Sequence, residues 1–119
     1  MTLADLRTPV RTVSREEAEQ LLTGAEFVRI GERPVPLRWT NQTDGQLIAT
    51  SFTRQGLPLL EFGVWRVNEV GQYCISMAWL ADPHERWCRH LVRNQDGYYL
   101  AEGLALTDVV ERCEVKAVR

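Results

Sequence analysis

Two cysteines and two histidines gather in one short stretch of the chain, at Cys74, His84, Cys88 and His90. Thiolate and imidazole groups are the ligands that copper and zinc prefer in proteins. The chain contains no C-x-x-C or H-x-x-x-H spacing, which would place two such ligands on one site. We therefore expect no metal or other cofactor, and His84 and His90 are the candidate ligands if a metal does bind.

The same stretch contains the nearest approach to a nucleophilic triad, formed by Cys88, His90 and Glu85. Residues two positions apart on a strand share a face but lie about 6.5–7 Å apart, too far for a direct hydrogen bond. A cysteine nucleophile needs its base within hydrogen-bond reach. The chain also lacks a glycine-rich phosphate loop. We expect no enzymatic activity.

Cys74 and Cys88 can instead face each other. If a hairpin turn is centred near Ala81 and Asp82, the two cysteines lie directly opposite on neighbouring strands. Opposed residues have Cα atoms about 4.5–5.5 Å apart, within the range that a disulfide tolerates. This favours a disulfide over the alternative of two buried thiols. Cys113 has no such partner and is expected to be a small buried apolar residue.

The elements that must position these residues begin with a short helix. Ser14 can cap its first backbone N–H groups, and Glu17, three residues later, can reach back to the Ser14 N–H. An apolar stripe that includes Leu22 gives the helix a face to bury, and Gly24 suits its end. Residues 1–13 are interpreted as an N-terminal arm, and residues 14–119 as a single β domain.

Beyond the helix, apolar and polar residues alternate, and turn residues recur between the alternating segments, including two Asp-Gly pairs. This pattern predicts strands at residues 26–31, 35–41, 46–53, 58–67, 72–79, 86–93, 98–102 and 108–118. With one helix to cover a face, such a sheet must close or fold over to bury its apolar side. The predicted fold class is mainly β, an antiparallel meander that forms a small barrel or a strongly curved sheet.

The hairpin that precedes the cysteine pair sets the position of Trp65. If residues 68–71 form a four-residue turn, Trp65 lies near Cys74 and packs on the disulfide. Tyr73 then belongs to the opposite face of the same strand. Both faces of that strand are substantially apolar, as expected for a strand covered on both sides.

Composition excludes several classes of function. The net charge of −2 gives no global attraction to nucleic acid. No apolar run approaches the ~20 residues of a membrane-spanning helix. The first residues lack the basic and apolar regions of a signal peptide. Two interpretations follow: a cytoplasmic protein, or a mature exported segment that begins after its signal.

The predicted helix ends in Leu21-Leu22-Thr23-Gly24. Four short motifs follow it in a fixed order: Gly63-x-Trp65-Arg66-Val67, Gly71-x-Tyr73-Cys74, Trp87-Cys88-Arg89 and Asp96-Gly97-Tyr98-Tyr99. In order and spacing, residues 14–103 resemble a family of small exported bacterial proteins, the domain-of-unknown-function family numbered 995. The resemblance implies export to the periplasm or outer surface and a paired Cys74–Cys88, and it implies no activity. The absent signal segment and the additional Cys113 depart from the family pattern.

Three functional hypotheses remain. The first is a non-enzymatic exported bacterial β domain, periplasmic or secreted, that binds a protein or other macromolecule through a sheet face or the loops around 80–86 and 53–58. The second is a calycin-like carrier of a small apolar ligand, which requires an open mouth lined by aromatic residues. The third is a metal-binding protein that uses His84 and His90. The candidate ligand-binding residues are Trp39, Trp65, Tyr73, Tyr99 and Arg66.

Overall fold

The computed structural model describes residues 1–6, 8–30, 37–52, 55–78 and 84–117. The predicted fold class is confirmed: the chain is mainly β, with one short α-helix near its N-terminus. The elements in chain order are η1 (Leu3–Asp5), β1 (Arg11–Thr12), α1 (Arg15–Leu22), β2 (Ala25–Arg29), β3 (Leu37–Asn41), β4 (Gln46–Phe52), β5 (Pro58–Val67), β6 (Tyr73–Met77), β7 (Glu85–Asn94), β8 (Gly97–Ala101) and β9 (Val110–Ala117). The hairpin turn predicted near Ala81 and Asp82 lies outside the described residues, as do residues 80–83 and 53–54 of the two loops predicted to bind a partner.

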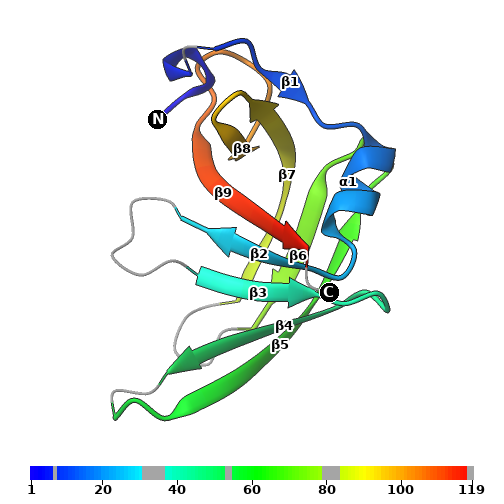
Figure 1. The fold of residues 1–119 in the computed structure, drawn as a ribbon, viewed down its shortest axis with the longest axis vertical. Helices are drawn as coiled ribbons and strands as arrows, with labels where there is room; N and C mark the ends of the chain where they lie inside the picture. Colours follow the sequence, from blue (N-terminus) through cyan, green and yellow to red (C-terminus); the bar gives the residue numbers. More distant parts are fainter. Residues whose placement is uncertain (7, 31–36, 53–54, 79–83, 118–119) are drawn as a thin grey trace.

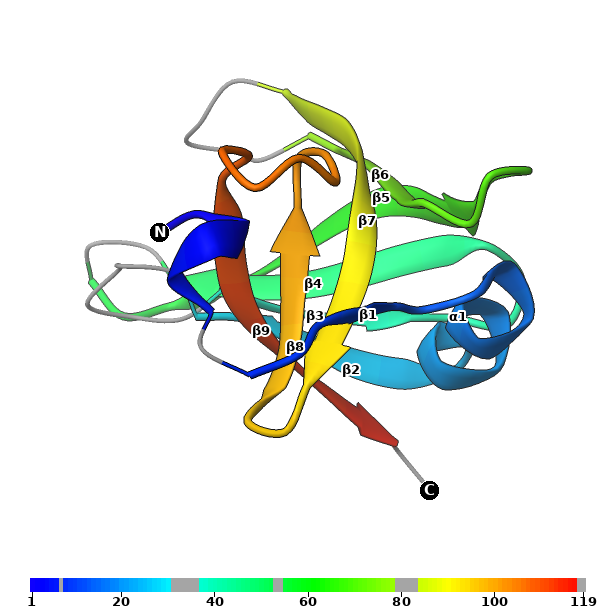
Figure 2. The same cartoon turned by 90° about the horizontal axis from the view of Figure 1, so that it is seen from above.

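Strands β2 to β9 form an antiparallel meander that closes into a barrel (Figures 1 and 2). Each strand pairs with the next one along the chain, and β9 returns to pair with β2, with Phe27 opposite Val115. Closure buries the apolar side of a sheet that one short helix could not cover.

Helix α1 begins as the sequence predicts and packs on β2, β5 and β9. The Ser14 hydroxyl accepts a hydrogen bond from the Glu17 backbone N–H at 3.2 Å. In place of the expected contact with the Ser14 backbone N–H, the Glu17 carboxylate accepts a hydrogen bond from the Arg11 guanidinium at 2.7 Å. Arg11 therefore ties the N-terminal arm to the first turn of the helix.

The N-terminal arm lies along the barrel wall (Figure 2). Strand β1 extends the sheet beside β7, with Arg11 opposite Arg93. Near the chain start, Thr2 forms a bridge with Val109. Leu3 is buried in a small cluster outside the barrel core.

The barrel interior is filled by aliphatic and aromatic side chains, and the largest of them are Trp39, Tyr73 and Phe27. Phe27 stacks on Trp39 with 5.2 Å between ring centroids. The Trp39 indole N–H donates to the Tyr73 hydroxyl at 2.8 Å, and that hydroxyl donates to the Asn41 side-chain oxygen. All four side chains are almost fully buried, and burial raises the pKa of Tyr73 above its usual value. A buried polar chain of this kind is stable only while its members remain hydrogen-bonded.

The turn between β5 and β6 is one residue shorter than expected. The Asn68 N–H donates to the Gln72 carbonyl at 3.0 Å, so the turn contains three residues, 69–71, and Gly71 has a φ of 87°. A positive φ of this size favours glycine. The shorter turn shifts the pairing of β5 with β6 by one position.

The expected contact of Trp65 with the disulfide is therefore wrong. Trp65 lies opposite Ile75, and Arg66 takes the place opposite Cys74. The Trp65 ring points to the barrel core, where it meets Tyr73 edge-on at 6.3 Å. A one-residue shift moves a side chain to the other face of a sheet.

Replacing Tyr73 with phenylalanine tests the buried polar chain. The Tyr73→Phe variant removes the hydroxyl that accepts from the Trp39 N–H and donates to the Asn41 oxygen. We expect it to lose about 1–3 kcal/mol of unfolding free energy, because removing one partner from a buried hydrogen bond costs about that much. Urea denaturation measures this loss. The matched control is Tyr98→Phe, at a half-buried position, and equal losses in the two variants would contradict the assignment.

Candidate functional site

Cys74 and Cys88 form a disulfide between β6 and β7. The two residues are directly opposed in the register, with Cα atoms 4.0 Å apart. The predicted pairing is confirmed, and Cys88 is exposed on the outer surface of the barrel. Disulfides persist in oxidising compartments and are rare in the cytosol, so the pairing is consistent with an oxidising compartment.

Cys113 remains free and is buried. Burial is the main reason that the pKa of its thiol is raised well above the usual value. The thiolate is the nucleophilic form of cysteine. Cys113 therefore fits the prediction of a small buried apolar residue.

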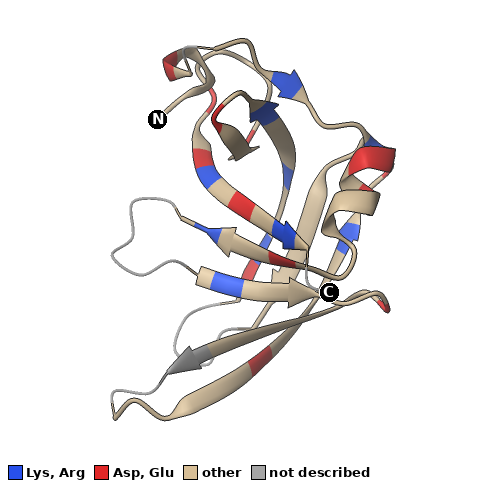
Figure 3. Ribbon diagram, viewed as in Figure 1, with Lys and Arg blue, Asp and Glu red and all other residues tan. Residues whose placement is uncertain are grey.

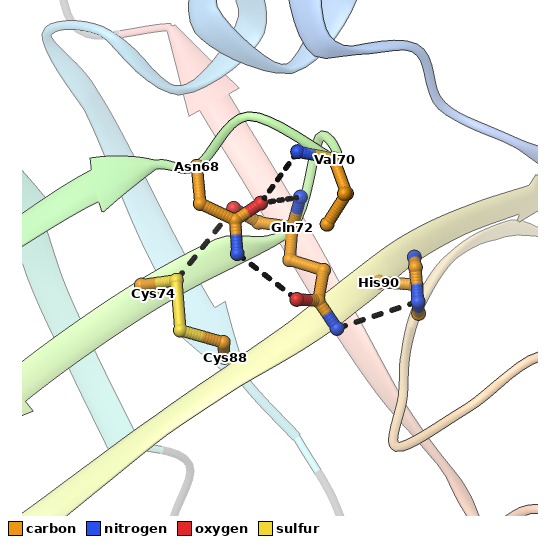
Figure 4. The surroundings of a disulfide bond; sticks show 6 residues. All are labelled: Asn68, Val70, Gln72, Cys74, Cys88 and His90. Carbon is orange, nitrogen blue, oxygen red and sulfur yellow. Dashed lines mark hydrogen bonds between the residues drawn. A yellow bond between two sulfur atoms is a disulfide. The ribbon is translucent and has the colours of Figure 1, made fainter.

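The two histidines have separate hydrogen-bond partners. His84 Nε2 lies 2.7 Å from the Ser76 hydroxyl. His90 Nε2 lies 3.3 Å from the Gln72 amide nitrogen, and Gln72 also accepts from Asn68 (Figure 4). Within the described residues, no group of three histidine, cysteine or acidic side chains could hold a metal ion. The structure therefore does not bring His84 and His90 together, and their metal role stays a prediction.

The aromatic residues predicted to bind a ligand do not line a common mouth. Trp39 and Tyr73 are buried in the barrel core, and Trp65 packs against that core while half-buried. Tyr99 belongs to the separate cluster with Leu3. The four aromatic residues are thus divided between two cores, Arg66 is exposed outside both, and the ligand-binding role of the set stays a prediction.

A half-buried ionic cluster that the sequence did not predict lies at the end of β2 and the start of β7. Arg29 donates to Glu111 at 2.6 Å and also to Glu85. Burial alone would lower the pKa of Arg29, but the two carboxylates raise it overall. Glu85 also accepts from the Trp87 indole at 2.9 Å, and the Arg89 guanidinium lies over that ring at 4.6 Å. These side chains hold one another in place.

Strand β5 carries large apolar side chains on its outer side as well as its inner side. Leu60, Phe62 and Val64 occupy alternate positions and are 64%, 58% and 56% exposed. We call these three residues the apolar row. Alternate residues of a strand share one face and lie about 6.6–6.8 Å apart. In β4 and β5 the charged residues are Glu61, which is buried, and Arg66, so this side of the barrel carries little charge (Figure 3).

The apolar row continues into a hollow over the disulfide. The register aligns Val64, Ser76 and Arg86 across three strands, and the next outward row contains Arg66 and the two cysteines. The hollow has a volume of about 360 Å³ and is lined by Val64, Trp65, Arg66, Cys74, Ile75, Ser76, Arg86, Trp87 and Cys88. We call the apolar row and this hollow together the β5–β7 face.

Comparison with known proteins adds no relative. No protein family, curated protein or solved structure matches the chain. The resemblance to the exported bacterial family therefore stays a prediction. In the part of the chain that the structure describes, no helix has the length and apolar character needed to cross a bilayer. The candidate site rests on the geometry alone.

Thiol counting tests the arrangement of the three cysteines. In the native protein at pH 8 we expect no rapid reaction with a thiol reagent, because one cysteine is buried and two are paired. In denaturant without reductant, one thiol should react, and peptide mapping should identify it as Cys113. With reductant, three should react. Three reactive thiols before reduction would contradict the Cys74–Cys88 disulfide.

Proposed function

We propose that this chain is a non-enzymatic binding domain that docks another protein on its β5–β7 face. The observation that carries the proposal is the apolar row, in which Leu60, Phe62 and Val64 are each more than half exposed. Contiguous exposed apolar side chains on a folded domain mark interaction sites more often than scattered ones do.

The apolar row is not needed to fill the barrel. Leu47, Tyr73 and Met77 are among the residues that fill the interior, and each is fully buried. The row lies on the other side of the same sheet, so its members add exposed apolar area without adding core. Exposed apolar area favours association with other chains, and the presence of three such residues in a row is explained if a partner covers them.

The disulfide supports a location outside the cytosol. We propose the periplasm or the exterior of a bacterial cell, which agrees with the resemblance of the cysteine motifs. A binding domain in such a compartment gains from a covalent clamp between β6 and β7, because a disulfide lowers the entropy of the unfolded chain. The clamp also lies within the proposed docking face.

The other two hypotheses have less support. A calycin-like carrier needs internal space, whereas the core side chains of the described strands pack against one another inside the barrel. A metal carrier needs converging ligands, whereas His84 and His90 contact Ser76 and Gln72. We rank both below protein binding.

Site-specific crosslinking tests the proposal. The photoreactive residue p-benzoylphenylalanine replaces Phe62 in one variant and Leu106 in a control, because Leu106 is an equally apolar side chain that is 71% exposed elsewhere. On irradiation in an extract of the native source, we expect one discrete crosslinked protein from position 62 and none from position 106. A Val64→Asp substitution should abolish that product. Equal crosslinking from both positions, or none from position 62, would refute the proposed docking face.

A further inference from the structure

We infer that the partner docks with an acidic, apolar segment whose carboxylate enters the hollow between Arg66 and Arg86. This inference rests on the proposed docking function of the β5–β7 face and specifies the chemistry of the partner. It is carried by the shape of the hollow, by the two arginines beside it and by its continuity with the apolar row.

The shape of the hollow follows from the sizes of the residues that line it. Cys74, Cys88 and Ser76 have short side chains, and the disulfide holds the first two together. Arg66 is opposite Cys74 on one side, and Arg86 is opposite Ser76 on the other. Two long cationic side chains thus flank a base of short ones, which leaves about 360 Å³ of open volume.

Arg66 and Arg86 are available to an incoming anion. Both are exposed, and within the described residues neither forms a salt bridge. By contrast, the Arg29 guanidinium is occupied by two carboxylates. A free guanidinium binds a carboxylate through two parallel N–H···O bonds, which are stronger than bonds between neutral groups.

The arginines and the apolar row form one continuous surface. Arg66 is the next outward residue after Val64 on β5, and Arg86 lies across the sheet in the same row as Val64. A partner that covers Phe62 and Val64 therefore brings its next side chain beside the hollow. The charge complementarity favours aspartate or glutamate at that place. A protein segment satisfies both parts of the surface, and a concave hollow receives a single side chain better than it fits a flat lipid surface.

A peptide titration of the 119-residue chain, monitored by ¹⁵N NMR, tests the inference. The probe is an acetylated, amidated pentapeptide in which phenylalanine or leucine alternates with aspartate. Its matched control has asparagine at the aspartate positions. We expect the acidic peptide to shift the amide signals of Ser76 and Arg86, and to bind at least about tenfold more tightly than the neutral peptide.

Charge reversal provides the second arm of the experiment. The Arg66→Glu/Arg86→Glu variant should lose the preference for the acidic peptide. An Arg112→Glu variant, altered at an exposed arginine on β9, should keep it. The native signal dispersion of each variant confirms that it is folded.

The outcomes separate the inference from the function on which it rests. If both peptides bind the face equally, or if the acidic peptide does not bind, the inference is overturned, whereas crosslinking from position 62 still supports docking. If neither peptide binds and position 62 crosslinks nothing, both fail. Binding to phosphatidylglycerol vesicles in place of the acidic peptide would also overturn the inference and assign the face to a membrane surface.

Discussion

The pairing of β9 with β2 is the constraint on which the rest of the structure depends. It closes the meander into a barrel, so each strand from β2 to β9 has one inward and one outward set of side chains. The interior of a barrel of this size is just wide enough for side chains to fill. Phe27, Trp39 and Tyr73 occupy much of that volume. Because these side chains fill the interior, large apolar residues at outward positions are exposed on the surface of the barrel.

Register then decides which residues form the candidate site. The three-residue turn between Asn68 and Gln72 places Trp65 in the core and Arg66 beside the disulfide. A turn one residue longer would exchange the two, and the hollow would lose one of its arginines. The Cys74–Cys88 disulfide fixes the neighbouring pair of strands, so the hollow is held in shape from both sides. The proposed recognition chemistry depends on these two local features.

The sequence predicted what local patterns encode. The Ser14 cap, the strand alternation and the opposition of Cys74 and Cys88 each depend on residues close together in the chain. It could not predict the Arg29 cluster, because Arg29, Glu85 and Glu111 meet only after the barrel has closed. The apolar row was missed for a different reason. Strand β5 has apolar residues on both faces, so alternation alone does not show whether Phe62 or Trp65 points inward.

If the apolar row serves recognition, its side chains add little to the stability of the fold. Urea denaturation of Phe62→Ser beside Leu47→Ser, a matched change at a fully buried position, tests this claim directly. We predict that Phe62→Ser changes the unfolding free energy by less than about 0.5 kcal/mol, as surface substitutions do. Leu47→Ser should lose about 3 kcal/mol or more, because it removes a buried leucine side chain. A loss of about 2 kcal/mol or more for Phe62→Ser would show that the row stabilises the fold, and would contradict the account.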